Sequence, residues 1–352
     1  MYPIQSPSRV ARWRHLPLIL SLVVFAACGT SPSSDPAAAG GDTPAPDTAP
    51  LKVAVLTPGL TNDGGFNSWA HRAITRLEDE GLIDATIREQ LADPSVAEPT
   101  AREFASTGYD LVIGHGIELG EPVLTVASDF PDVHFTVSGG IDILDRTTDN
   151  VEAWTYDFLQ LGYLLGFVAG HVDDVDKVGV VFPEQFPFRE ATLEGLERGL
   201  ASVAPEVTVE VVWTGSSQDA QAAGEAARSL VAAGADILFA DSNLASAVAN
   251  VAAEADPQVL TLGTTGAGEV ARRVNITSVE LDMYPTFRSY VDRIRTGEFG
   301  NLGHISGIAN AGLVIVPLEE GVQTDRVPDD LAERVERLAT DLADGTITLE
   351  SS

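Results

Sequence analysis

The chain has 352 residues and is strongly acidic, with 52 Asp and Glu against 21 Lys and Arg and a formal net charge of −31. This charge argues against nucleic acid as a partner, because phosphate binding needs a basic surface. The chain contains one cysteine, so it cannot form an internal disulfide. Its body of roughly 300 residues exceeds one comfortable core and predicts two lobes.

The first 27 residues have the pattern of an export signal. Three arginines and no acidic residue precede an apolar run over 16–27, which is too short to span a bilayer as a helix. Cys28 follows the small pair Ala26-Ala27 directly, so we predict that it becomes the lipid-bearing N-terminus of a lipoprotein. The alternative is a plain secretory signal followed by an incidental buried thiol.

The next segment has the composition of a flexible spacer. Ala, Pro, Gly, Asp and Thr dominate it, and such a composition buries too little apolar surface to offset the entropy of ordering. From Cys28 on, 18 basic residues face 52 acidic ones, a formal charge of −34. We therefore predict a signal peptide at 1–27 and a lipid-anchored, disordered tether at 28–50, which hold the body at the extracytoplasmic face of the cell membrane.

Beyond the tether, short β-branched runs alternate with Ala-rich segments of helical period. We predict strands at 52–56, 110–113, 134–137, 177–181, 207–213, 236–239 and 259–262, and helices at 66–80, 159–171, 189–202, 220–233 and 245–254. This alternation predicts parallel sheets covered on both faces. One sheet should use strands from 52 to about 151, and the other strands from 177 to about 262.

The C-terminal region should extend these sheets. A helix at 283–295 and a strand at 312–316 cannot form a domain alone, so we expect the chain to cross between the lobes, and an amphipathic helix at 329–343 closes it. The predicted fold class is α/β, with two doubly wound parallel-sheet lobes joined by a hinge. The first lobe is expected at 51–155 plus part of 280–310, and the second at 156–279 plus part of 311–352.

No catalytic pattern stands out in the sequence. There is no phosphate-binding P-loop and no nucleophile elbow, and the six histidines lack metal-ligand spacing. We therefore predict no catalytic residue, no metal and no cofactor. The remaining enzyme hypothesis is an exported hydrolase that uses Asp63, Asp219 or Asp241 as its acids.

Ligands of open parallel sheets bind at the carboxyl edges of the strands. The loop after the first strand is the richest there, because Asn62, Asp63 and Asn67 offer polar arms and Phe66 a flat face for stacking. The alternative is that Asp63 or Asn62 only caps the next helix while Phe66 packs inward. Later loops add the candidates His115, Glu121, Phe186, Trp213, Asp241 and Thr265.

Several motifs occur in the order found in one known family. The run Asp63-Gly64-Gly65-Phe66-Asn67-Ser68 is similar to an Asp-x-Ser-Phe-Asn-Gln opening, and residues 162–170 are similar to a Tyr-Leu-x-Gly-x-x-Ala-Gly helix. With matches at 215–219, 234–236 and 277–279, the chain from 52 to about 316 resembles the substrate-binding lipoproteins of the basic membrane protein family. Its best-known members are purine nucleoside receptors of ABC importers. The resemblance implies a type I periplasmic-binding-protein fold, closure of two lobes on the ligand, and an ABC permease as partner.

The resemblance also implies roles for individual residues. Phe66 would stack on the base, and Asn62, Asp63 and Asn67 would line its polar edge. Glu121 stands where the nucleoside receptors have an Asp.

Three departures accompany this match. Ser217 replaces an aromatic residue, and an acidic residue near Thr265 and a lysine near Leu281 are missing. The resemblance then leaves Phe186, Phe188 or Trp213 for the second stacking face and Glu280 or Asp282 for the ribose hydroxyls.

We therefore expect a lipid-anchored solute-binding protein of an ABC importer, which binds a small polar or heterocyclic ligand such as a purine nucleoside and catalyses no reaction. The alternative is a membrane-tethered ligand sensor or surface interaction protein with the same fold. A permease gene beside this one would favour import, and a kinase partner would favour sensing.

Overall fold

A computed structural model describes residues 49–241, 244–263 and 265–349, and these form one compact unit. The predicted signal peptide, Cys28 and nearly all of the tether lie outside the described residues. Within the described ranges, no helix is both long enough and apolar enough to cross a membrane. The lobe boundaries given above stay a prediction.

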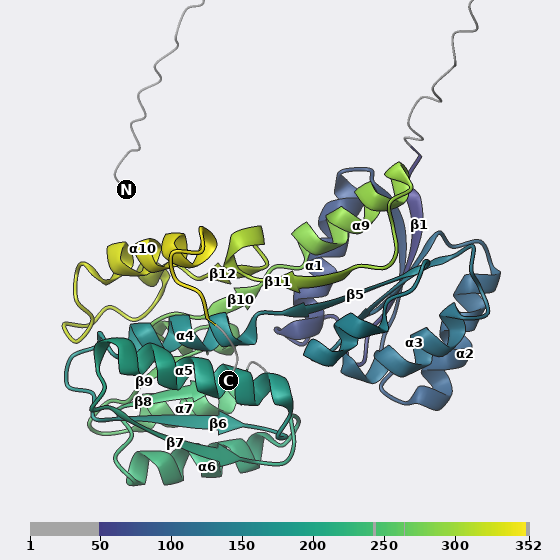
Figure 1. Ribbon diagram of the computed structural model, residues 1–352. Coiled ribbons are helices and arrows are strands. Elements are labelled where there is room, and N and C mark those ends of the chain that lie inside the picture. The colour runs from purple at the N-terminus through teal and green to yellow at the C-terminus, as the bar shows by residue number, and fades with distance from the viewer. Residues whose placement is uncertain (1–48, 242–243, 264, 350–352) are drawn as a thin grey trace, which may run out of the picture. The chain divides into compact units, whose positions relative to one another are not determined.

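Two parallel sheets organise the described part of the chain (Figure 1). The first has the order β2-β1-β3-β4-β5-β11 and the second β7-β6-β8-β9, and every neighbouring pair in them is parallel. The strands are β1 Leu51–Leu56, β2 Ile83–Arg88, β3 Leu111–Gly114, β4 His134–Ser138, β5 Val151–Tyr156, β6 Lys177–Phe182, β7 Thr208–Trp213, β8 Ile237–Ala240, β9 Leu260–Leu262 and β11 Gly303–Ser306. The strand order reverses between β1 and β3 and again between β6 and β8. Ligands bind beside such reversals in open α/β sheets.

Helices cover both faces of the first sheet (Figure 1). They are α1 Phe66–Asp79 and α9 Tyr284–Thr296 on one face, and α2 Pro94–Ser106 and α3 Gly120–Ala127 on the other. Strand β1 shows the reason, because Val53 and Val55 pack in the core with α1 while Ala54 and Leu56 pack in the core with α2 and α3. Successive side chains of a strand point to opposite faces, so an all-apolar strand needs cover on both.

The second sheet is covered in the same way by α4 Phe158–Ala169 and α5 Pro187–Val203 on one face, and α6 Ala220–Ala232 and α7 Ala245–Glu254 on the other. Helices α4 and α5 pack backbone against backbone. A Cβ atom on Gly162 would lie 1.9 Å from the Thr192 carbonyl oxygen, and one on Gly166 would lie 2.1 Å from that of Leu196. Only glycine allows this approach, and it positions the starts of both helices beside each other.

The chain crosses between the two sheets after β5, after α8 (Ala271–Val274) and after β11. Strand β10 (Val279–Leu281) lies on the second crossing and β12 (Leu313–Ile315) on the third, and they pair antiparallel as a separate small sheet. The prediction that the strand near 312–316 joins one of the large sheets is therefore wrong. The closing helix α10 (Leu331–Ala343) buries the expected stripe of Leu331, Val335, Leu338 and Leu342.

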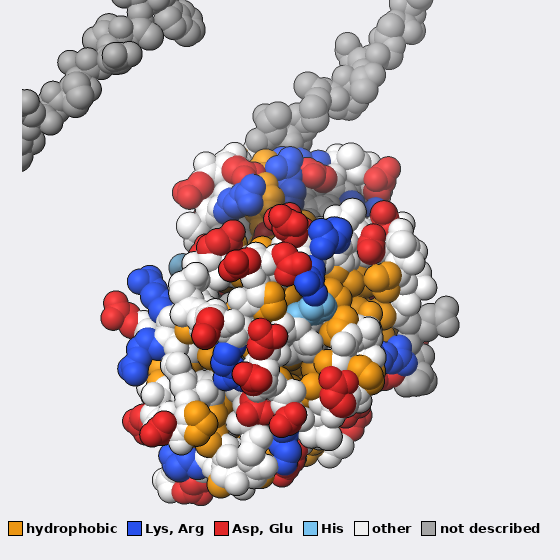
Figure 2. Space-filling view, turned by 90° about the vertical axis from the view of Figure 1, so that its left-hand side faces the viewer, with side chains coloured by type: hydrophobic (Ala, Val, Ile, Leu, Met, Phe, Trp, Pro, Cys, Tyr) orange, Lys and Arg blue, Asp and Glu red, His pale blue; other side chains and the backbone are white. Residues whose placement is uncertain are grey.

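Short 3-10 helices complete the fold at Ile117–Leu119, Ile141–Arg146, Thr265–Ala267, Ile308–Asn310 and Leu318–Glu320. The sequence pattern missed four strands: β5, β10, and the two edge strands of the first sheet, β2 and β11. Edge strands are half-exposed and give a weak apolar signal, and only Ile83 is buried in β2. On the face drawn in Figure 2, carboxylates are spread widely with Lys and Arg among them, so the acidic charge is distributed over this face.

Candidate ligand-binding site

A cavity of about 360 Å³ lies at the carboxyl ends of both large sheets. Its wall is contributed by the loops after β1, β3, β4, β6 and β8, the starts of α1, α4 and α5, and strand β10. Nine lining side chains are aromatic: Phe66, Trp69, Trp154, Tyr156, Phe158, Phe182, Phe186, Phe188 and Phe239. Flat apolar walls of this kind suit a planar or ring-shaped ligand.

Asp63 fixes the start of α1 at the edge of the cavity. Its Oδ1 atom accepts hydrogen bonds from the Gly65 amide at 2.9 Å and the Ser68 amide at 3.0 Å, and its Oδ2 atom accepts from the Asn67 side-chain amide at 2.8 Å. Burial alone would raise the pKa of Asp63, but these hydrogen bonds outweigh it and hold the pKa below the ordinary value. The capping alternative therefore describes Asp63 well, and its carboxylate serves the helix.

Phe66 faces the cavity from the front of an aromatic stack. Its ring lies 3.9 Å from that of His115 at an interplanar angle of 18°, and His115 is followed by Trp154 at 5.9 Å. The Nε2 atom of His115 lies 3.2 Å from the Phe66 carbonyl oxygen, which can only accept, so Nε2 carries the proton. Burial lowers the pKa of His115 to about 4. His115 is thus a neutral support that holds Phe66 in place.

Polar atoms without a protein partner lie on the wall formed by the first sheet. Asn67, Trp154 and Tyr156 line the cavity, and their Oδ1, Nε1 and hydroxyl atoms are buried with no hydrogen-bond partner among the described residues. Burial raises the pKa of Tyr156 well above its ordinary value of 10, so its hydroxyl remains a donor. Buried polar groups are normally satisfied, so three unsatisfied atoms in residues of one wall are unusual.

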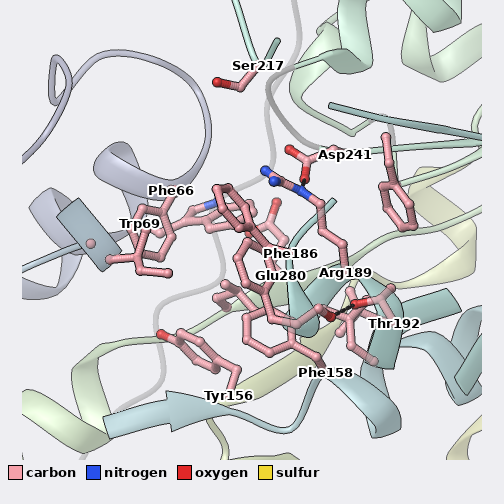
Figure 3. A pocket seen from close by; sticks show the side chains of 18 of the residues that line it. Phe66, Trp69, Tyr156, Phe158, Phe186, Arg189, Thr192, Ser217, Asp241 and Glu280 are labelled. Carbon is pink, nitrogen blue, oxygen red and sulfur yellow. Dashed lines mark hydrogen bonds and ion pairs between the residues drawn. The ribbon is translucent and has the colours of Figure 1, made fainter. Parts of the chain in front are cut away.

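The opposite wall carries a charged cluster. Arg189, whose side chain is 9% exposed, donates from Nε to Asp241 Oδ2 at 3.0 Å and from Nη1 to the Glu184 carbonyl oxygen at 3.0 Å. Figure 3 shows Arg189 and Asp241 entering from the opposite side of the view to Phe66 and Trp69. Glu184 Oε1 also accepts from the Ser217 amide at 3.2 Å. These contacts tie together the loops that follow β6, β7 and β8.

The crossing strand β10 adds a further acid. Glu280 lines the cavity and pairs with Arg72 of α1 at 3.1 Å. Leu281 and Ser217, two of the positions at which the sequence departs from the nucleoside-receptor pattern, also line the cavity. Asp282 instead accepts the Tyr284 amide at the start of α9. In the described ranges, no group of three or more His, Cys, Asp or Glu residues could hold a metal ion.

The structure brings half of the predicted site residues to one place. Asp63, Phe66, Asn67, Phe186 and Asp241 line the cavity; their roles toward a ligand stay predictions. Thr265 begins the short helix Thr265–Ala267, whose Gly266 lines the cavity, but its side chain lies outside the described part of the structure.

Four predicted site residues are not on the cavity wall. Asn62 is exposed, and His115 is fully buried behind Phe66. Glu121 has a side chain that is 72% exposed and pairs with Arg146 at 2.6 Å, because it projects from the first turn of α3 toward the 3-10 helix Ile141–Arg146. Trp213 packs on Phe182 with ring centroids 5.2 Å apart, so it supports the wall from behind.

Sequence reasoning missed Trp154, Tyr156 and Arg189. The two aromatics alternate with smaller residues at the end of β5 (Val151–Tyr156), a strand that the sequence pattern did not predict. The sequence could have indicated Arg189 as a site residue. It lies in the first turn of α5, where the helix dipole disfavours a cation. A positive charge in such a place needs another reason, and the carboxylates beside it provide one.

Comparison with known proteins agrees with this architecture. A model of the family described as ABC transporter substrate-binding protein PnrA-like matches residues 51–333. A solved solute-binding protein of an ABC transporter system from Conexibacter woesei is 44% identical, with 85% of this chain and 98% of that chain covered and a TM-score of 0.73. The predicted type I periplasmic-binding-protein fold is thereby confirmed.

Two curated relatives are more distant. A putative ABC transporter glucose-binding protein of Haloferax volcanii is 28% identical over 51% of this chain and 46% of its own length. A purine-binding protein of Brucella abortus is 27% identical over 56% of each chain. The chain spans about half the length of these curated relatives. Because the family model covers most of its described residues, this chain belongs to the PnrA-like family of ABC transporter substrate-binding proteins, the basic membrane protein family that its motifs resemble.

Proposed function

We propose that this protein is the solute receptor of an ABC importer and that its cavity binds a small ring-shaped ligand with polar edges, such as a purine nucleoside, without transforming it. The observation that carries the proposal is the aromatic cavity at the switch points of both sheets. Its lining residues combine flat apolar faces with buried donors and acceptors that have no partner among the described residues. Such a wall recognises shape and hydrogen-bonding pattern, and the absence of a predicted nucleophile or metal set fits binding without chemistry.

The ligand would lie between groups from the two sheets. Phe66 and Asn67 come from the helix after β1, whereas Phe186 and Arg189 come from the segment after β6. A ligand that contacts residues from both sheets binds best when the two groups of residues lie close enough to touch it at the same time. Binding therefore shifts the population toward a closed form. The permease would recognise that closed form.

The same proposal places the protein at the membrane. Cys28 would carry the lipid, and residues 28–50 would let the body meet solute and permease at the extracytoplasmic face. The strongly acidic composition makes nucleic acid an unsuitable partner. The relatives named for glucose and for purine define the two ligand classes to compare first.

The test is thermal unfolding of the mature chain, made without its signal peptide, against nucleosides, free bases, sugars and amino acids. A ligand that binds only the folded state raises the unfolding midpoint with concentration. We expect a shift from one ring-shaped class, and its loss in Phe66→Ala, because the exposed face of the stack is removed.

Phe167→Ala is the matched control. Phe167 is also half-buried and contacts a histidine ring, that of His171 at 4.3 Å, but it does not line the cavity. It should lower the midpoint of the free protein and leave the ligand-induced shift in place. No shift with any class, or a shift that Phe66→Ala leaves unchanged, would contradict the proposal.

A further inference from the structure

We infer that the part of the cavity lined by β10, α4 and the second sheet is an apolar subsite for a hydrocarbon arm of the ligand. The solute is then a polar ring that carries an apolar substituent. The inference rests on the proposed function, because it assumes that the cavity binds a solute. The ring could be a heterocycle or a sugar, and the experiment below separates these two sources.

Five buried apolar side chains make up this subsite, which we call the apolar floor. They line the cavity from α4, β6, β8 and β10: Leu165, Phe182, Phe239, Val279 and Leu281. Each is at most 8% exposed, and all five belong to one core cluster. Because core packing holds these side chains, the floor exists before any ligand arrives.

The floor is joined by contacts between these elements. The rings of Phe182 and Phe239 meet edge to face, with their centroids 5.5 Å apart. Val279 and Leu281 are two residues apart in β10, so they share one side of that strand. Glu280 lies between them and pairs with Arg72 of α1 at 3.1 Å, so its carboxylate is directed to a helix of the first sheet.

The buried hydroxyl groups on this side of the cavity are bonded within the protein. Thr192 lines the cavity from α5, and its Oγ1 atom donates to the Phe188 carbonyl oxygen at 2.9 Å. Ser278 lines it beside the floor, and its Oγ atom accepts from the Asn275 side-chain amide at 3.5 Å. These hydroxyls therefore serve the protein's own hydrogen bonds.

The two sides of the cavity differ in the polar groups that they leave unsatisfied. Three buried polar atoms in lining residues of the first-sheet wall have no partner among the described residues. On the other side, Arg189 is paired with Asp241 at 3.0 Å and with Glu184 at 3.4 Å, and the floor itself is hydrocarbon. The floor is therefore the part of the cavity suited to an apolar group.

The energetics of hydration favour such a group there. Water over an apolar floor makes few hydrogen bonds to the protein, and an apolar group that displaces it gains affinity. A hydroxyl or a charge in the same place would lose its own hydration without gaining a partner. The floor thus selects an alkyl chain or a second apolar ring.

The test is isothermal titration of the mature chain with two ligand series in which the apolar arm grows. One series is 9-methyl-, 9-propyl- and 9-benzyladenine, and the other is methyl, propyl and benzyl β-D-glucopyranoside. In the series whose ring binds, we expect the affinity to rise about fourfold for each methylene group, or about sixteenfold from the methyl to the propyl member. The heat capacity change of binding should become more negative along the series, because more apolar surface is buried.

Variants in β10 and β12 assign the gain to the floor. Leu281→Asn makes the floor polar, so the gain from methyl to propyl should vanish while the affinity for the methyl member changes less than about threefold. Leu313→Asn is the matched control, because Leu313 is buried and faces Leu281 in the pairing of the two strands but does not line the cavity. It should lower the free energy of unfolding and leave the gain in place. If Leu281→Asn does not fold, Val279→Thr and its cross-strand control Ile315→Thr repeat the comparison.

Each result decides the inference. A gain in one series only would support it and identify the ring. A flat or falling affinity along a series whose methyl member binds would overturn it and leave a receptor for compact rings in place. A gain that persists in Leu281→Asn and in Val279→Thr would also overturn it, because the arm would then lie elsewhere. If no member of either series binds, the inference is overturned, and the thermal unfolding panel described above shows whether the proposed function falls with it.

Discussion

The close crossing of α4 and α5 predicts that a methyl group added at the contact lowers the stability of the protein. In Gly166→Ala, the new methyl group would lie 2.1 Å from the Leu196 carbonyl oxygen, whereas ordinary contacts to a Cβ atom begin near 3.4 Å. The two helices must therefore separate by roughly 1 Å, and overpacking of this kind typically costs about 1–3 kcal/mol. Because Phe158, Arg189 and Thr192 line the cavity from the starts of these helices, ligand affinity should fall as well.

Gly224→Ala is the matched control for this change. Gly224 lies inside α6, and the atoms nearest to a Cβ atom there would be those of the Arg228 guanidinium, at an ordinary 3.5 Å or more. The change should raise the free energy of unfolding by about 0.5–1 kcal/mol, because alanine restricts the unfolded chain and favours a helix. Urea unfolding of both variants measures the two expected changes in the free energy of unfolding, a decrease for Gly166→Ala and an increase for Gly224→Ala. If Gly166→Ala were as stable as the wild type, the argument that backbone contact requires glycine at this crossing would be refuted.

Three further predictions follow from named contacts. Asp63→Ala should lower the free energy of unfolding by about 1 kcal/mol and also weaken ligand binding. The control Asp93→Ala removes the cap of α2 and should lower the free energy of unfolding by a similar amount without weakening ligand binding. If Asp93→Ala weakened binding as much as Asp63→Ala does, our account of Asp63 would be contradicted. Burial alone would raise the pKa of Glu152, but its hydrogen bonds with His304, Arg293 and Gly300 outweigh it and keep the pKa below its ordinary value of 4.5, so wild-type stability should fall as pH drops through that lowered pKa. Glu152→Gln should be less stable than the wild type at pH 7, and its free energy of unfolding should fall less steeply between pH 7 and pH 3. If the free energies of unfolding of the two proteins fell in parallel over this range, the hydrogen bonds of the Glu152 carboxylate would not be the source of the pH dependence. In the full-length chain, Cys28→Ser should abolish incorporation of labelled fatty acid, and labelling that persists would exclude Cys28 as the anchor.

Much of the architecture was predictable because it follows from local patterns. Apolar runs such as that of β1 need cover on both faces, and the Ala-rich helical segments between strands supply it, so parallel sheets follow. The positions of strand ends then indicate which loops can meet, and this reasoning found Phe66, Asn67, Phe186 and Asp241. The strands that local patterns missed were the half-exposed edge strands β2 and β11, the internal strand β5 and the short strand β10.

Side-chain roles inside these loops were less predictable. His115 and Phe66 both follow strand ends, yet one is buried and supports the other. Glu121 sits beside the buried Leu119 and Gly120 but projects to solvent. The direction of a side chain at a loop depends on a few backbone angles and on what packs behind it, and sequence spacing does not contain this information.

The sequence by itself determined the α/β class, the alternation of strands and helices, the family, and the loop after β1 as the first place to look. Only the tertiary structure decided that Arg189 meets Asp241 across 52 positions of sequence, that Trp154 and Tyr156 form the opposite wall, and that β10 pairs with β12. The physical reason is that local periodicity sets which faces are apolar. The convergence of distant loops depends instead on strand order, helix crossing and the path of the connecting segments, all of which are properties of the folded chain.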